Sequence, residues 1–428
     1  MTSLRQITLP FGGETVTLRI PEDRITLLAK PEKRPANPFR LLSQALKHPV
    51  DSPPLGKFLR GGSKLTILVN DADRATPTAQ ILDAISSEIT DFPGTITFMI
   101  ATGTHGPLTS EQKRKILGHF DDSDRYKVIC HDARDIKNHI RLGTTSRGTE
   151  VFLDTRVAGA DRLIAIGSVE PHYFAGFTGG RKSIFPGAAV YASIEQNHKL
   201  AMEPAVGVLK LKGNPVHEDM VEACRMPEVP VFSIQTILDS KDRLFGAVAG
   251  NLDASFERAV AIAEEAFTLP VHQLSDMVIA AAEPPLDKNL YQAHKAIENT
   301  ISIVKPGGIL ILIAACREGL GNDTFVRLLS QSNRPEDVIQ SIQKSYTLGT
   351  HKAARIARHV MEKEIWLVST LDPQVVRDIF MIPFPDAQSA VDRALSQFPD
   401  SFITLIPHAD VMIPIIRVSP KNHIMIML

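Results

Sequence analysis

One stretch of the chain, residues 170–200, brings together residue types that covalent and acid–base chemistry use. It reads EPHYFAGFTGGRKSIFPGAAVYASIEQNHKL, with His172 before Lys182 and His198 after it. Histidine changes its charge near neutral pH, and a lysine on a loop can act as a nucleophile or a covalent anchor. Because Lys182 lies between a glycine pair and the turn FPGA, we interpret it as such an anchor. His198 lies in the helical pattern SIEQNHKL, where packing or solvent exposure is the commoner role of a histidine.

The glycine pair of this stretch raises the question of a phosphate site. A P-loop needs Gly-x4-Gly-Lys-Ser/Thr, but GFTGGRKS, beginning at Gly176, has Arg181 where the second glycine must stand. No Gly-x-Gly-x-x-Gly fingerprint of a dinucleotide site occurs here either. The backbone amides of Gly179 and Gly180 can still approach an anion, and Arg181 and Lys182 bring positive charge to it. We therefore predict that this loop binds a phosphate-bearing ligand by another geometry.

Further polar side chains follow apolar runs of strand length at 64–71, 95–102 and 161–168. Loops at the C-terminal ends of neighbouring parallel strands converge on a crevice in open α/β sheets. The side chains that these loops carry are Asp71, Asp73, Arg74, His105, Glu170 and His172. A single one of the 14 histidines would most simply be a packed or surface residue. Histidines on two such loops, with aspartate and arginine on a third, favour a functional site.

The order of the elements predicts an α/β protein with two Rossmann-like domains and an active site in the cleft between them. The chain begins with a β-hairpin pattern around Gly12-Gly13, and a helix is expected over 251–267 with Asp253 as its N-cap. We assign residues 1–272 to the N-terminal domain and 273–409 to a smaller C-terminal one. The tail 410–428 is expected to return to the N-terminal domain.

The composition excludes several classes of protein. Among 428 residues, 43% are hydrophobic, and 47 basic against 48 acidic side chains give a formal net charge of -1. Bulk attraction to nucleic acid or to a membrane is therefore not expected. The 3 cysteines form no CxxC pair, no apolar run approaches roughly 20 residues, and the N-terminus lacks a signal-peptide pattern. We expect a cytoplasmic protein.

Four motifs together resemble the lactate racemase family, from about residue 5 to 410. They are DADRATPT, ATGTH, EPHYFAGFTGGRKSIFPGAAVYASIEQNH and YQAHKA. The resemblance implies a covalent cofactor on Lys182, the nickel-pincer nucleotide (nickel with pyridinium-3,5-bisthiocarboxylate mononucleotide), held through a thioamide. It also implies that His198 is the protein ligand of a square-planar nickel, whose other donors are one carbon and two sulfurs. Soft sulfur donors in this geometry suit nickel(II).

The same resemblance implies roles for the other motif residues. His105 and His172 match a pair of acid/base histidines. Racemisation needs one such group for each enantiomer, and proton loss from the hydroxyl accompanies hydride transfer to the cofactor. Asp71 and Arg74, with Asp73 between them, match a loop that contacts cofactor and substrate.

Two further residues, Gln292 and Lys295, match the pair that holds the substrate. At i and i+3 they share one helix face, and with Arg74 they could grip a carboxylate. Without the resemblance, a glutamine and a lysine on a helix would be read as a solvated face.

The chain departs from the lactate-specific members at one point. Those members have a tryptophan beside the substrate in the second domain, but Trp366, the single tryptophan here, lies in the strand pattern EIWLVS. The corresponding stretch, LGTHKAARIARHV, offers His351 and Lys352 instead. We therefore expect a larger or more polar 2-hydroxy acid than lactate, with His351 or Lys352 meeting its extra group. The two residues could equally be the first turn of an ordinary helix.

Two other functions fit the sequence. A zinc or iron metallohydrolase would place His105, His172, His198 and Asp71 around one metal. A non-catalytic module would close on a carboxylate or a nucleotide. For the racemase, the expected partners are the small-molecule substrate and the enzymes that make the cofactor, and the protein could be a homodimer.

Overall fold

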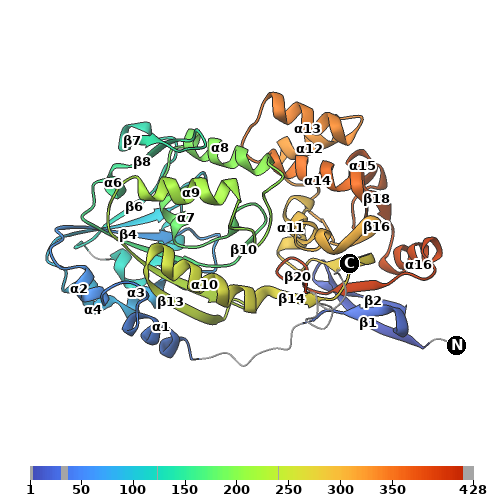
Figure 1. The fold of residues 1–428 in the computed structure, drawn as a ribbon, viewed down its shortest axis with the longest axis horizontal. Coiled ribbons are helices and arrows are strands. Elements are labelled where there is room, and N and C mark those ends of the chain that lie inside the picture. The colour runs from blue at the N-terminus through green and yellow to red at the C-terminus, as the bar shows by residue number, and fades with distance from the viewer. Residues whose placement is uncertain (1–2, 30–36, 123, 240, 418–428) are drawn as a thin grey trace, which may run out of the picture. The chain divides into compact units, whose positions relative to one another are not determined.

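The computed structural model describes residues 3–29, 37–122, 124–239 and 241–417, and it divides the chain into two compact units (Figure 1). The first unit is formed within residues 33–266, and the second within residues 1–32 and 267–428. Each unit contains a six-stranded sheet and helices. The predicted α/β class with two domains is confirmed.

The sheet of the first unit has the strand order β13-β12-β9-β4-β5-β6. Its strands are β4 (Lys64–Asn70), β5 (Thr95–Ala101), β6 (Lys127–Cys130), β9 (Arg162–Ser168), β12 (Val231–Leu238) and β13 (Leu244–Asn251). All neighbours pair in parallel except β12 and β13, which are antiparallel. The central strands read as continuous apolar runs because both faces are covered, and Ile67, Phe98 and Ile164 are fully buried.

Helices and two small hairpins complete the first unit. The helices are α1 (Pro38–Lys47), α2 (Leu55–Phe58), α3 (Thr78–Ala84), α4 (Ser86–Thr90), α5 (Ser110–Leu117), α6 (Thr155–Ala158), α7 (Arg181–Ile184), α8 (Tyr191–Lys199), α9 (Pro215–Arg225) and α10 (Leu252–Phe267). The hairpins are β7 (His139–Thr144) with β8 (Glu150–Asp154) and β10 (Pro171–His172) with β11 (Gly176–Phe177).

The helix predicted over 251–267 is confirmed as α10, but its predicted N-cap is wrong. The side-chain oxygen of Asn251 accepts hydrogen bonds from the backbone N–H groups of Asp253 and Ala254, at 3.0 and 3.2 Å. Asn251 is therefore the cap, and Asp253 lies in the first turn.

The sheet of the second unit has the order β18-β17-β16-β15-β19-β3, with all neighbours parallel. Its strands are β3 (Ile25–Leu27), β15 (Ser275–Ala281), β16 (Val304–Ile313), β17 (Glu364–Val368), β18 (Ile382–Phe384) and β19 (Ile403–Ile406). Its helices are α11 (Leu290–Thr300), α12 (Asp323–Ser330), α13 (Pro335–Lys344), α14 (His351–Glu362), α15 (Pro373–Asp378) and α16 (Ala387–Gln397).

The structure corrects the predicted domain boundaries at both ends of the chain. The N-terminal hairpin, β1 (Leu4–Phe11) with β2 (Glu14–Pro21), belongs to the second unit, because its buried face, including Leu9 and Leu18, packs in the apolar core of that sheet. The following strand, β3, pairs with β19. Residues 1–272 are thus not one domain.

The tail also stays with the second unit as far as residue 417. Strand β20 (Ile413–Ile416) pairs in parallel with β14 (Thr268–Val271), and both strands lie in that unit. The predicted return of the tail to the N-terminal domain is therefore wrong for 410–417, and 418–428 lie outside the described residues.

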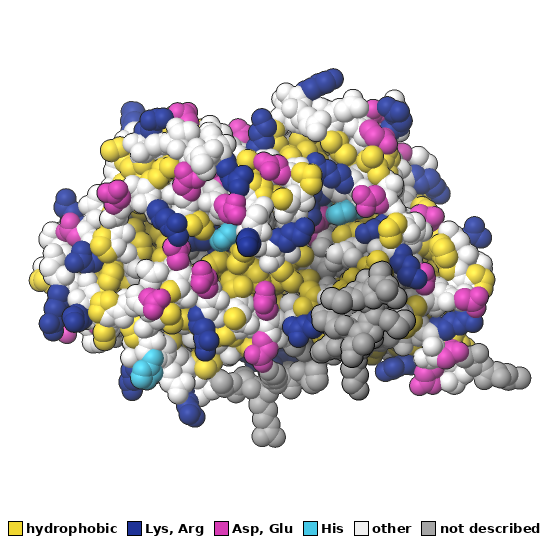
Figure 2. Space-filling view, in the orientation of Figure 1, with side chains coloured by type: hydrophobic (Ala, Val, Ile, Leu, Met, Phe, Trp, Pro, Cys, Tyr) yellow, Lys and Arg dark blue, Asp and Glu magenta, His cyan; other side chains and the backbone are white. Residues whose placement is uncertain are grey.

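The distribution of surface charge and the hydropathy of the helices agree with what the composition predicts. On the face seen in Figure 2, basic and acidic side chains are interspersed, as the near-zero net charge leads one to expect. Within the described ranges, no helix combines the length and the apolar character that crossing a membrane requires.

Candidate functional site

The loops after β4 and β5 bring Asp71 and His105 together. These strands are neighbours in the first sheet, so their C-terminal ends meet at one edge. His105 Nδ1–H donates to Asp71 Oδ2 at 2.5 Å, and Asp73 Oδ2 lies 3.4 Å from the same nitrogen. The bond fixes the tautomer of the ring, which leaves Nε2 as the nitrogen that can take a proton.

Electrostatics around His105 favour its protonated form. The hydrogen bond from Asp71 raises the pKa of His105, and this effect outweighs desolvation, which lowers it. The Asp71 side chain is buried at 9% exposure, whereas the His105 side chain is 52% exposed. A buried carboxylate thus supports an imidazole that remains open to solvent, as a proton acceptor for a ligand must be.

The loop after β9 is connected to the loop after β4. Arg74 Nη1 donates to Glu170 Oε1 at 3.1 Å, and Thr76 and Ser168 share a hydroxyl hydrogen bond of 2.8 Å. These hydrogen bonds link the two loops, whose strands β4 and β9 are also paired neighbours in the sheet. All three strand-end loops predicted from the sequence meet in the first unit.

The ring of Phe174 contacts the three residues singled out in the stretch 170–200. His172 packs edge-on against it with a centroid distance of 4.4 Å, and His198 does so at 4.9 Å. The ammonium nitrogen of Lys182 lies 5.6 Å from the ring centroid. Three residues that are 26 positions apart at most are thus gathered around one buried aromatic side chain.

Burial disfavours the charged forms of Lys182 and His198. Desolvation, with the positive charges of Arg74 and Arg181 adding to it, lowers the pKa of Lys182 well below its usual range. Desolvation, with a contribution from Lys182, lowers the pKa of His198 to about 3. A neutral amine is a nucleophile, and a neutral imidazole is the form that binds a metal.

The N–H of Gly180 is not available for the predicted anion cradle. The N–H of Gly180 donates to Gln235 Oε1 at 2.9 Å, so it is turned into the protein. A Cβ on Gly179 would lie 2.8 Å from the ring of Phe256, and one on Gly180 would lie 2.6 Å from Ser233 Oγ. Both glycines are needed for close packing against α10 and β12.

Arg181 likewise points inward, and its predicted contact with a phosphate is not supported. It is 2% exposed, and its guanidinium donates to the carbonyl oxygens of Thr178 at 3.1 Å, Phe177 at 2.9 Å and Ala175 at 3.4 Å. Its other face covers the ring of Phe256 at 4.1 Å. The side chain therefore shapes the loop that precedes Lys182.

The second unit carries the other predicted residues, on α11 and α14. Gln292 and Lys295 are half-buried on α11. Lys352, in the first turn of α14, donates from Nζ to the carbonyl oxygen of Tyr291 at 2.8 Å and lies 3.5 Å from the centroid of that ring. His351 is 3% exposed, and its Nδ1 is 3.1 Å from the hydroxyl of Tyr346. His351 is thus a core residue at a helix start, whereas Lys352 lies beside the predicted substrate residues.

Sequence reasoning missed a buried charge cluster on the same two helices. Glu298 of α11 is 3% exposed and lies 3.1 Å from His294 Nε2 and 2.9 Å from His359 Nε2. Arg355 of α14 donates to the same carboxylate through two nitrogens. The i, i+4 spacing of His294 and Glu298 was a signal for this contact.

The structure removes the ligand set of the metallohydrolase alternative. Across the described ranges, the one group of three side chains able to hold a metal consists of Asp71, Asp73 and His105. His172 and His198 are not part of it, so the four-residue zinc or iron site expected from the sequence does not form.

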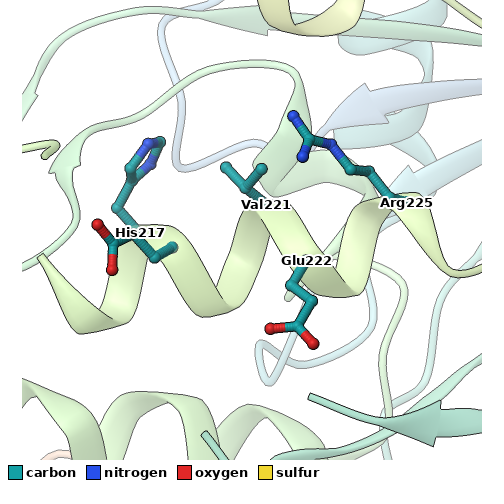
Figure 3. A pocket seen from close by; sticks show the side chains of 5 residues that line it. His217, Val221, Glu222 and Arg225 are labelled. Atoms are coloured by element: carbon teal, nitrogen blue, oxygen red, sulfur yellow. The ribbon is translucent and has the colours of Figure 1, made fainter. Parts of the chain in front are cut away.

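A hollow lies along α9, on the same unit. Figure 3 shows His217, Val221 and Arg225 along one side of this helix, with Glu222 directed away from them. The lining residues are His217, Glu218, Val221, Glu222 and Arg225. None of the predicted site residues lines it.

Comparison with known proteins finds similarity to lactate racemases along most of the chain. Residues 11–208 match the lactate racemase N-terminal domain, and residues 271–413 match the lactate racemase C-terminal domain. The lactate racemase of Thermoanaerobacterium thermosaccharolyticum is 28% identical over 94% of this chain and 98% of its own length. The lactate racemase of Lactiplantibacillus plantarum is 27% identical over 94% of this chain and 97% of its own.

Solved structures agree with these matches. The lactate racemase apoprotein from T. thermosaccharolyticum superposes with a TM-score of 0.88 at 27% identity, covering 96% of this chain and 100% of that one. A protein from Thermotoga maritima, at 14% identity and a TM-score of 0.66, shares the fold; it covers 91% of this chain and 100% of its own.

Proposed function

Because this chain belongs to the lactate racemase family, we propose that it is an isomerase that racemises or epimerises a 2-hydroxy acid. The cofactor we propose is a nickel-pincer nucleotide held on Lys182. The single observation that carries the proposal is the arrangement around Phe174, where an amine and an imidazole whose charged forms burial disfavours lie beside His172.

The chemistry of these donors fits the cofactor. A thioamide can form only from an unprotonated amine, and the lowered pKa of Lys182 favours that form. A nickel ion with sulfur donors accepts a neutral imidazole as a further ligand, and the pKa of His198, about 3, keeps that ring neutral. Lys182 would hold the cofactor and His198 the metal. When bound, the cofactor would supply the acceptor and donor of the hydride.

The proton chemistry belongs to two histidines in different surroundings. His105 has Nδ1–H directed to Asp71, so its Nε2 is poised to accept the hydroxyl proton of a substrate. His172 has Nδ1 turned to the backbone N–H of Ala175, from which it accepts at 3.3 Å. Its Nε2 would then carry the hydrogen and serve as the proton donor. Such a pair suits a reaction in which the hydroxyl proton is lost and regained while the hydride leaves and returns on either face of the same carbon.

The substrate carboxylate would be held by positive and amide groups. Arg74, Gln292 and Lys295 are the residues we propose for it. Arg74 is ordered by its bond to Glu170, which presents the guanidinium in one orientation. A bidentate or charge-assisted contact of this kind would fix the substrate carbon relative to the two histidines.

The proposed substrate is larger or more polar than lactate. Trp366 supports this view, because it is 2% exposed, stacks on Phe384 at 4.6 Å and donates its indole N–H to Glu364 at 2.7 Å. It is therefore a core residue of β17 and cannot shield a small substrate.

The experiment is an intact mass with metal analysis of the protein produced together with the enzymes that build the cofactor. Wild type is expected to carry an adduct of mononucleotide size and nickel. Lys182→Ala should lose both, and Lys212→Ala, which changes an exposed lysine of the same unit, should keep both.

Two results would count against the proposal. If the protein carries no adduct under conditions that load a known lactate racemase, the proposed cofactor is wrong. If the adduct survives in Lys182→Ala, Lys182 is not the residue that holds it. If the adduct is found, racemisation of single enantiomers of several 2-hydroxy acids, followed by chiral chromatography, identifies the substrate.

A further inference from the structure

A side-chain hydrogen bond joins the end of strand β6 to the loop that carries His105. The pairing of β5 with β6 ends at Ile100 and Cys130, and the backbone N–H of His131 still donates to the carbonyl oxygen of Ile100 at 3.0 Å. Beyond this point a side chain replaces the backbone, because the hydroxyl of Thr102 donates to the carbonyl oxygen of His131 at 2.6 Å. Thr102 and His131 are both 3% exposed, so water has little access to this bond.

The backbone from Thr102 to His105 forms a tight turn. The N–H of His105 donates to the carbonyl oxygen of Thr102 at 3.0 Å, which is the closing hydrogen bond of a four-residue turn. Gly103, the second residue of the turn, has a φ of +57°, in the left-handed region that favours glycine. The residue whose hydroxyl is bonded to His131 is thus the first residue of the turn that ends at His105.

The same turn is bonded to the segment that follows Lys182. The N–H of Gly103 donates to the carbonyl oxygen of Gly187 at 3.1 Å, and the N–H of Gly187 donates to that of Lys182 at 2.8 Å. Gly187 permits this close approach, since a Cβ on it would lie 2.6 Å from the carbonyl oxygens of Lys182 and Ser183. The turn is therefore held between the end of β6 and the segment of the proposed cofactor anchor.

We propose that Thr102 is a positioning residue for His105, because its hydroxyl fixes the turn of His105 to the end of β6. This inference rests on the proposed function, in which His105 takes the hydroxyl proton of the substrate. Asp71 orients the ring of His105, whereas Thr102 orients the backbone that carries this ring. Misplacing a reacting group by about 1 Å can cost about a hundredfold in rate.

The chain offers matched variants for a test. Thr102→Val keeps the branched shape of the side chain and removes its donor, which leaves the buried carbonyl oxygen of His131 without this hydroxyl. Thr102→Ser keeps the donor. The control is Thr66→Val, because Thr66 is also 3% exposed and its hydroxyl donates to the carbonyl oxygen of Arg156 at 2.7 Å. Thr66 lies in the N-terminal half of β4, away from the loop that carries Asp71.

The first measurement is kcat and KM of the cofactor-loaded proteins with a 2-hydroxy acid that wild type racemises. We expect kcat to fall about tenfold to a hundredfold in Thr102→Val, with KM within about twofold of wild type, because the groups that bind the substrate are unchanged. Thr102→Ser should recover most of the rate, and Thr66→Val should keep it. Equal kcat in Thr102→Val and Thr66→Val would overturn the inference. If Thr102→Val does not fold, Thr102→Ala, which also lacks the donor, takes its place.

Hydrogen exchange tests the turn without turnover. The N–H groups of Gly103 and His105 are both bonded in wild type, and their exchange in the full chain can be followed by mass spectrometry of a peptide that spans them. This peptide should exchange about tenfold faster in Thr102→Val, but not in Thr102→Ser or Thr66→Val.

The inference and the proposed function can fail separately. If no 2-hydroxy acid is racemised while exchange rises only in Thr102→Val, the proposed function fails and the placement of the turn by Thr102 stands. If wild type racemises an acid, and neither exchange nor kcat changes in Thr102→Val, the proposed function stands and the inference is wrong.

Discussion

The carboxylate of Asp71 lies 2.5 Å from Nδ1 of His105, and this buried acid is what distinguishes His105 from a surface histidine. The bond orients the ring, selects its tautomer and raises its pKa. In the proposed reaction the neutral form of His105 is the base. Activity should therefore fall as the pH drops through a value above the ordinary histidine pKa, where the ring takes up a proton.

Replacement of Asp71 by asparagine tests this relationship. Because the carboxylate raises the pKa of His105, Asp71→Asn should move the acidic limb of kcat/KM to lower pH. It should also reduce kcat tenfold or more, since the amide no longer enforces one tautomer. Asp73→Asn is the control, because Asp73 is exposed and 3.4 Å away, and its shift should be smaller. Rates measured over about pH 5 to 9 decide the matter; coincident acidic limbs for Asp71→Asn and wild type would contradict the role of Asp71.

The ring of Phe174 makes a second prediction possible. It contacts His172, Lys182 and His198, so Phe174→Leu should loosen all three and lower the fraction of protein that retains the cofactor. The free energy of unfolding should fall by only about 1 kcal/mol, as for similar exchanges of buried apolar side chains. Phe98→Leu, in the buried strand β5, should cost about as much stability and leave cofactor retention as it is. Equal retention in the two variants, by intact mass, would refute the role of Phe174.

The sequence was sufficient to predict strands β4, β5 and β9 of the first sheet and the meeting of Asp71 with His105, but it did not predict β12 and β13. Apolar runs of strand length have few alternatives, and loops at adjacent strand ends must come together. The predictions that were wrong concern features that depend on contacts between distant segments of the chain. Arg181 has the residue type of an anion ligand, but its carbonyl partners exist only once the loop has folded. The residues of the hairpin that contains Leu9 do not indicate which of the two sheets the hairpin covers.

The buried position of Arg181 leads to a third prediction. Arg181→Met would leave the carbonyl oxygens of Thr178, Phe177 and Ala175 buried without their donor. The free energy of unfolding should fall by about 3 kcal/mol or more, since each unsatisfied acceptor is costly. Arg225→Met, which removes an exposed ion pair with Asp253, should cost less than about 1 kcal/mol. Urea denaturation measures both. Normal stability of Arg181→Met together with poor cofactor retention would instead restore Arg181 as a phosphate ligand.

The cluster around Glu298 should make the stability of the second unit depend on pH. Burial alone would raise the pKa of Glu298, but Arg355 and His359 lower it well below its usual range. A depressed pKa contributes stability that is present above the unfolded value, near 4.3, and is lost as the pH falls through the folded value. Glu298→Gln should therefore lower the free energy of unfolding by about 3–5 kcal/mol at pH 7, because it removes the buried carboxylate to which Arg355 donates. The loss should shrink as the pH falls through the lowered pKa of Glu298, where wild type protonates the same carboxylate. Glu362→Gln, at an exposed position of α14, should change little at either pH. A loss of stability in Glu298→Gln that is the same at every pH would show that packing, and not charge, holds these two helices together.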